Sequence, residues 1–119
     1  MEVMMETGYI MVITTCVDRE SARAISKLLV ERRLAACVQM MPVESVYTWQ
    51  GSICEDNETA LIIKSKAALF EEISLTIKEK HSYEIPEIVQ IPITDGLPEY
   101  LNWIDECTGT TYGSKRNLV

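Results

Sequence analysis

Hydrophobic and polar residues repeat along this chain with two periods, and the change from one to the other predicts the order of its elements. Apolar side chains fill Tyr9–Cys16 almost without a break, which predicts a central strand that is covered or paired on both sides. Residues 19–33 carry apolar side chains at helical spacing, and Asp18 before them is a suitable N-cap. Residues 67–80 repeat this spacing. We therefore expect two helices, each after an extended segment.

Two extended segments between these helices predict a long β-hairpin. Residues 34–50 and residues 52–65 both show strand patterns, and Gly51 between them accepts the positive φ of a tight reversal. Pro42 has no N–H to donate to a ladder, so it marks a bulge or an edge strand. The two arms are long enough to project past the body of the domain.

The rest of the pattern completes the order strand, helix, strand, strand, helix, strand. Residues 87–94 predict a fourth strand, which Pro92 places at a sheet edge, and residues 100–104 predict a short helix that ends near Gly109. This order predicts one α+β domain with the ferredoxin-like βαββαβ plan, in which the first and third strands are central. Its ordered core is expected over about residues 9–107, with flexible ends at 1–8 and 110–119.

Charge and hydropathy narrow the possible partners. The net charge is −7, from 11 basic and 18 acidic residues. Such a chain repels phosphate backbones and anionic lipid, so we expect no nucleic-acid partner and no membrane. No apolar run reaches the roughly 20 residues that cross a bilayer, and the first residues lack the bases of a secretory signal. The expected compartment is the cytoplasm.

The four cysteines form no CxxC pair, so neither a zinc ribbon nor a thioredoxin-like motif is predicted. Buried free thiols are the simplest interpretation of most of them. No nucleophile and base pattern, GxGxxG loop or Walker loop is present. We therefore expect a protein that is not an enzyme.

The projecting hairpin has too little of the domain left to cover it. Tyr47, Trp49 and Ile53 lie on this part of the hairpin. Exposed aromatic surface and uncovered edge strands both favour association with identical subunits. The alternative is that the arms fold back on their own domain.

His81, the single histidine, stands between the second helical pattern and the last strand pattern. Imidazole is a common ligand for copper or zinc, and a thiolate favours Cu(I). Cys37, at the start of the second strand, is expected near the end of the second helix, where it would form a partial metal site with His81. The alternative is that His81 caps the last helical carbonyls and that Cys37 fills the core.

Lys64 is the one cation within the apolar run ETALIIKS, where an unpaired charge is costly. We expect Glu84 or Glu87 as its partner; these two are three apart on an extended segment, which points them to opposite faces. Lys64, Trp49, Tyr83 and Glu87 would then line a polar cleft between subunits. A structural ion pair that fixes the subunit register is the alternative interpretation.

Five segments together resemble the CutA divalent-cation-tolerance family, in its order and at its spacing, over about residues 9–107. They are ERRLAACVQ, SVYTWQG, ETALIIKS, HSYEIPEI and EYLNWI. The resemblance implies a ferredoxin-like domain in a homotrimer that is similar to the PII signalling proteins, with the hairpin packed on adjacent subunits. It also implies tolerance to divalent cations and copper binding, and no established reaction.

Three positions depart from the family pattern. Ser82 replaces the usual proline after the histidine, and Lys80 stands where some members have a second histidine. The copper cysteine of some members falls on Thr14, and Cys16 lies two residues along, on the same strand face. The candidate ligands for copper or another divalent cation are therefore His81, Cys37 and Cys16. The alternative function is a PII-like sensor that binds a small anionic ligand between subunits, with Lys64 as its charge partner.

Overall fold

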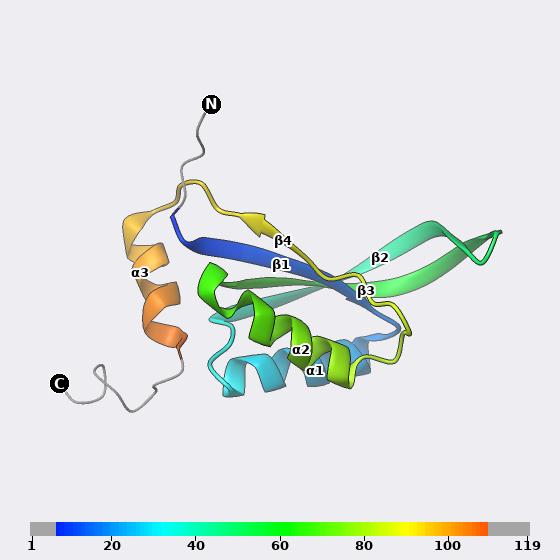
Figure 1. Ribbon diagram of the computed structural model, residues 1–119, viewed down its shortest axis with the longest axis horizontal. Helices are drawn as coiled ribbons and strands as arrows, with labels where there is room; N and C mark the ends of the chain where they lie inside the picture. Colours follow the sequence, from blue (N-terminus) through cyan, green and yellow to red (C-terminus); the bar gives the residue numbers. More distant parts are fainter. Residues whose placement is uncertain (1–6, 110–119) are drawn as a thin grey trace.

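One four-stranded antiparallel sheet organises residues 7–109, the part of the chain that this computed structural model describes. The strand order is β2-β3-β1-β4, so the first and third strands are central and the two proline-bearing strands are edges, as predicted (Figure 1). The elements in chain order are β1 (Tyr9–Cys16), α1 (Arg19–Glu31), β2 (Cys37–Trp49), β3 (Ser52–Lys66), the 3-10 turn η1 (Ala67–Leu69), α2 (Phe70–Lys80), β4 (Val89–Pro92) and α3 (Pro98–Cys107). The predicted ferredoxin-like α+β fold is confirmed.

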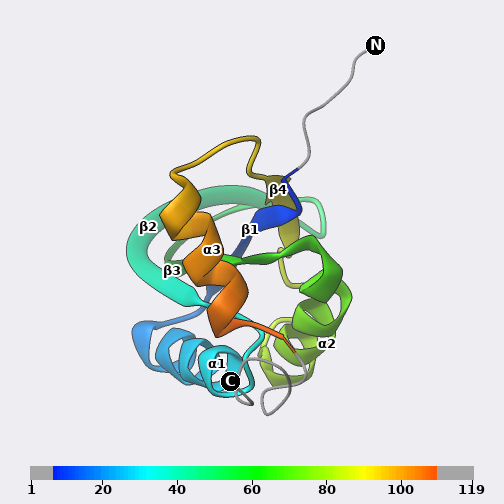
Figure 2. The same ribbon diagram turned by 90° about the vertical axis from the view of Figure 1, so that its left-hand side faces the viewer.

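Helices α1 and α2 cover one face of the sheet, and α3 packs across its end (Figures 1 and 2). Side chains of β1 alternate between buried and half-buried positions, because successive residues of a strand point to opposite faces. Ile10, Val12 and Cys16 belong to the cluster that packs under the two helices, together with Leu61 and Ile63 of β3. Within residues 7–109, no helix covers the other face of the sheet along its whole length.

The hairpin of β2 and β3 projects beyond both helices, as expected (Figure 1). Its register runs without a break from Cys37–Lys64 to Trp49–Ser52, so Pro42 marks an edge strand and not a bulge. Gln50 and Gly51 close it with φ of 51° and 83°. Two positive values in a two-residue loop are typical of a type I′ turn, whose twist matches the twist of the strands.

Several boundaries differ from the predicted ones. Helix α1 ends at Glu31, not at Arg33, because Arg33 turns to a φ of 61° and the N–H of Leu34 bonds to the Leu29 carbonyl. Strand β4 pairs with β1 only over Val89–Pro92, which is shorter than the predicted 87–94.

The helices near the chain's end also differ in detail. The first turn of the predicted helix 67–80 is the 3-10 turn η1. Helix α3 begins earlier than predicted because Pro98 occupies its first turn, where a missing N–H costs nothing.

Helix α3 is tied to two distant parts of the fold. The Lys66 ammonium lies 2.9 Å from the Asp105 carboxylate, and the N–H of Gly109 donates to the Arg33 carbonyl at 3.0 Å.

The first described residue is also held in the fold, because the Thr7 hydroxyl donates to the Ile93 carbonyl. The remaining residues of the expected flexible ends, 1–6 and 110–119, lie outside the described residues. Within residues 7–109, no helix is long and apolar enough to span a membrane.

Candidate functional site

His81 directly follows α2 and holds the start of the next connection against β1. Its Nε2 lies 2.6 Å from the Thr15 carbonyl oxygen, and its Nδ1 accepts the N–H of Tyr83 at 3.1 Å. A carbonyl can only accept, so Nε2 carries the proton and donates it, while Nδ1 supplies its lone pair to Tyr83. His81 therefore does not cap the helix carbonyls with its ring, and both of its nitrogens are engaged within the chain.

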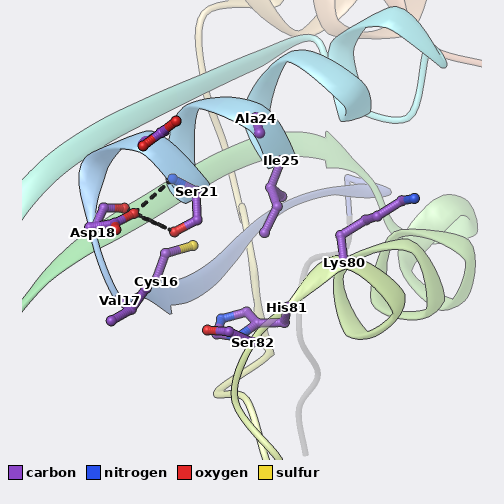
Figure 3. A pocket seen from close by; sticks show the side chains of 10 residues that line it. Cys16, Val17, Asp18, Ser21, Ala24, Ile25, Lys80, His81 and Ser82 are labelled. Carbon is purple, nitrogen blue, oxygen red and sulfur yellow. Dashed lines mark hydrogen bonds between the residues drawn. The ribbon is translucent and has the colours of Figure 1, made fainter.

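A cavity of about 370 Å³ lies between the N-terminus of α1 and the end of α2, and both Cys16 and His81 line it (Figure 3). Asp18 caps α1 at its rim by accepting the Ser21 N–H at 2.8 Å, and the hydrogen bonds from Ser21 hold the pKa of Asp18 below its usual value. The Cys16 side chain is 1% exposed. Burial, with smaller contributions from Asp18 and Glu58, raises its pKa to about 11, so the thiol stays protonated at neutral pH.

Cys37 is not brought to this cavity, which corrects the expected pairing of Cys37 with His81. Cys37 lies opposite Lys64, and Lys64 lies opposite Met11 of β1. His81 binds β1 at Thr15, four residues further along. At about 3.3 Å per residue this separation is roughly 13 Å along the strand, before the distance across two strands is added. Cys37 is half-buried, so it is not a filled core position either.

The described residues of one copy do not form a closed metal site. No group of three or more histidine, cysteine, aspartate or glutamate side chains in residues 7–109 is placed to hold a metal ion. A structural zinc site needs about four such ligands. Cys16 and His81 alone supply one thiol and one imidazole, which is a partial set.

A second and larger cavity, of about 720 Å³, lies between the hairpin and the connection that follows His81. We call it the hairpin groove; its lining includes Tyr47, Trp49, Glu58, Tyr83, Glu84 and Glu87. Trp49, Tyr83 and Glu87, which were expected to share a cleft, therefore lie together. Glu84 and Glu87, expected on opposite faces, both reach this groove.

Lys64 is not in the hairpin groove and does not pair with Glu84 or Glu87. Its ammonium lies 5.7 Å from the centre of the Tyr100 ring in α3, a cation–π distance. The register of β3 against β1 separates Lys64 from the groove. Lys64 lies opposite Met11, whereas the groove begins at Thr15.

Two phenols of the hairpin groove donate to carboxylates. Tyr83 Oη donates to Glu58 Oε2 at 2.6 Å, and Tyr47 donates to the Asp56 carboxylate. Burial and then the bond to Glu58 raise the pKa of Tyr83, and the bond to Asp56 raises the pKa of Tyr47 to about 12. Sequence analysis did not identify Glu58 and Asp56 as the partners of these phenols. Their spacing of two in β3 puts them on one face, but nothing in the sequence indicated which tyrosines would meet them.

Comparison with known proteins shows the family to which the chain belongs. The sequence profile described as "CutA1 divalent ion tolerance protein" matches residues 10–107. The chain belongs to this family. The divalent-cation tolerance protein CutA of Thermus thermophilus is 46% identical over 99 residues, which cover 82% of this chain and 96% of that protein. The chloroplastic CutA of Arabidopsis thaliana is 38% identical, and its match covers 83% of this chain and 55% of that protein.

Solved CutA structures share the fold. CutA1 of Oryza sativa superposes with a TM-score of 0.85 at 32% identity, over 90% of this chain and 99% of the other. Thermus thermophilus CutA1 gives 0.83 at 44% identity, over 85% and 99%. The CutA of Archaeoglobus fulgidus, described as periplasmic, gives 0.82 at 40% identity, over 83% and 97%. The Thermus thermophilus and Archaeoglobus fulgidus proteins are named for tolerance of divalent cations.

Proposed function

We propose that this chain is a homotrimeric, cytoplasmic protein that binds copper or another divalent cation and acts in tolerance to such ions. The observation that carries the metal-binding part is the cavity that Cys16 and His81 line together. One soft thiol and one imidazole favour copper over calcium or magnesium, which take oxygen ligands. Membership of the CutA1 family supports the link to cation tolerance.

The partial ligand set points to exchangeable binding and not to a resident ion. A cation at this cavity has to compete with the Thr15 carbonyl and the Tyr83 N–H for the His81 ring. It also has to displace the proton of the Cys16 thiol, whose pKa is raised to about 11. Both costs weaken binding, and the second makes binding stronger at higher pH, because metal binding releases the thiol proton.

Calorimetric titration of Cu(I), Cu(II) and Zn(II) tests the site. We expect His81→Ala and Cys16→Ser to weaken copper binding by about tenfold or more. Cys107→Ser is the matched control, because Cys107 ends α3 at the opposite end of the sheet. Cys37→Ser should also leave copper affinity unchanged, because Cys37 lies opposite Lys64 and does not line this cavity. Equal copper affinity in the wild type, His81→Ala and Cys16→Ser would remove this cavity from the function.

The proposed trimer rests on apolar side chains that one copy leaves in water. Val46 is 69% exposed and Ile53 is 78% exposed, both on the projecting part of the hairpin. Burying them against other copies gains about 25 cal/mol for each Å² of apolar surface. Light scattering should give three times the chain mass of 13.5 kDa, and Ile53→Asp should shift it to a smaller species. A wild-type mass near that of one chain at micromolar concentration contradicts the trimer.

The cytoplasm is supported by the four cysteines, all of which are free. Free thiols persist in a reducing compartment. Fractionation of cells that express the untagged chain tests this, and recovery with periplasmic or secreted markers would contradict it.

The anionic-ligand sensor has less support than cation binding. Three carboxylates line the hairpin groove, and none of the described residues that line it is basic. Lys64, the expected charge partner of an anion, lies beside Tyr100.

A further inference from the structure

We propose that a cation bound at His81 loosens the base of the projecting hairpin, because the His81 ring cannot hold the cation and the Tyr83 N–H together. This regulation rests on the proposed function, since it concerns the cavity that Cys16 and His81 line (Figure 3). Tyr83 donates its N–H to His81 Nδ1 at 3.1 Å and its phenol hydrogen to Glu58 Oε2 at 2.6 Å. We call these two hydrogen bonds the Tyr83 latch.

Both nitrogens of the His81 ring already have partners. Nδ1 accepts the Tyr83 N–H, and Nε2 donates to the Thr15 carbonyl at 2.6 Å. If Nδ1 binds the cation, its one lone pair is used and the Tyr83 N–H loses its acceptor. If Nε2 binds the cation, the proton of the neutral ring moves to Nδ1, where it faces the Tyr83 N–H as a second donor. Either way, the bond between the Tyr83 N–H and the ring is lost.

Nδ1 is the less costly of the two binding atoms. Binding there keeps the hydrogen bond from Nε2 to the Thr15 carbonyl, whereas binding through Nε2 loses that bond as well. A histidine that binds a metal commonly donates its other ring N–H to a carbonyl or carboxylate, which fixes the tautomer and orients the ring. The Thr15 carbonyl supplies this contact, so it acts as the group that positions His81.

A short connection passes this change on to the hairpin. Only Ser82 separates His81 from Tyr83, and the centres of the two rings are 4.7 Å apart. Tyr83 is half-buried, and an N–H without an acceptor is costly in such a place, so the backbone shifts toward a new partner. The phenol of the same residue is bonded to Glu58, and this shift therefore weakens that bond.

Glu58 places the Tyr83 latch at the hairpin base. Thr59 forms the last pair of β3 with β1, opposite Cys16, and Glu58 is the next residue of β3 toward the hairpin tip. Cys16 and His81 are therefore both linked to Glu58, one through the sheet and the other through Tyr83. Because coupling is reciprocal, contacts that hold the hairpin base also weaken cation binding. All of these contacts lie within one chain, so they need no free surface on the hairpin.

Anaerobic titration of Cu(I) against a coloured competing chelator tests the Tyr83 latch. Tyr83→Phe keeps the ring and the backbone N–H but removes the bond to Glu58, so Cu(I) should bind about three- to tenfold more tightly. Glu58→Gln keeps an acceptor and should give a smaller gain. Tyr47→Phe is the matched control, because the bond that it removes, to Asp56, joins two residues of the hairpin itself. It should leave the affinity unchanged.

Amide hydrogen exchange, measured by NMR with and without Cu(I), tests the direction of the effect without relying on affinity. The Tyr83 amide and the amides of β3 around Glu58 should exchange faster in the Cu(I)-loaded protein. Amides of α3, at the opposite end of the sheet, serve as the internal control and should not change.

Two results would overturn the Tyr83 latch and leave the metal site intact. One is Cu(I) binding that His81→Ala weakens and Tyr83→Phe does not strengthen. The other is a Tyr83 amide that exchanges no faster when Cu(I) is bound. Absence of Cu(I) binding, or binding that His81→Ala leaves unchanged, would overturn the metal site and the latch together.

Discussion

Tyr83 donates its phenol hydrogen to Glu58 at 2.6 Å, across 25 positions of sequence. Glu58 lies one residue beyond Thr59, which forms the last pair of β3 with β1, opposite Cys16. The bond therefore holds the connection after α2 against the part of β3 that does not pair with β1. Both residues line the hairpin groove, so the same contact stabilises the hairpin base and shapes the groove.

Replacing Tyr83 by phenylalanine should lower the free energy of unfolding by about 1 kcal/mol, because a carboxylate loses its hydrogen-bond donor in a half-buried place. Urea unfolding at one fixed protein concentration measures this. Tyr47→Phe is the matched control, since Tyr47 is 40% exposed and its bond to Asp56 competes with water. A larger loss in Tyr47→Phe than in Tyr83→Phe would contradict this assignment.

The same tyrosine should make stability fall at alkaline pH. Its pKa in the folded chain lies above the ordinary value of 10.0, first through burial and then through Glu58. The folded state keeps this proton where the unfolded chain has lost it. The contribution is therefore complete below about pH 10 and is lost as pH rises toward the folded pKa. Unfolding midpoints measured from about pH 9 to 11 should decline less steeply in Tyr83→Phe, and identical slopes would count against the raised pKa.

Cys16 should react with iodoacetamide more slowly than the other thiols. Burial raises its pKa from 9.0 to about 11, which lowers the thiolate fraction at pH 8 by about a hundredfold relative to an ordinary cysteine. Its 1% exposure slows access further. Peptide mass spectrometry after brief labelling should find the half-buried cysteines, Cys37, Cys54 and Cys107, modified before Cys16. Early modification of Cys16 in folded protein would show that its cavity opens readily.

The hairpin turn offers a stabilising substitution. Gln50 adopts a φ of 51° at the first turn position, where asparagine is favoured over glutamine. Gln50→Asn should therefore stabilise the chain by about 0.5 kcal/mol. Gly51→Ala, at a φ of 83°, should destabilise it by about 1 kcal/mol. Thermal unfolding compares the two variants, and shifts of the same sign would mean that another turn forms in solution.

The fold was predictable because the spacing of apolar residues along the chain agrees with the secondary structure that each segment adopts. Tyr9–Cys16 matches β1 residue by residue, and the prolines at 42 and 92 identified the two edge strands correctly. The end of α1 was not predictable, because Arg33 takes a left-handed conformation that its residue type rarely adopts. The short β4 depends on where its pairing with β1 stops, which is a tertiary property.

The candidate sites were predicted only in part, for a related reason. Alternation along a strand tells which face a side chain occupies, but the register between strands decides how far along the sheet it lies. Trp49, Tyr83 and Glu87 line one groove of a single copy, whereas Lys64 and Cys37 lie further toward the other end of the sheet than expected. The role of each grouped residue in binding stays a prediction.

The place of β1 in the sheet has a consequence for synthesis of the chain. Among the described strands β1 is made first, and it lies between two partners that are made later, β3 and then β4, which begins only at Val89. The chain must therefore be translated past Val89 before β1 can complete its pairing on both sides. Until then its apolar side chains are open to chaperones and to other nascent copies, so we expect the yield of folded protein to depend on translation speed and chaperone supply.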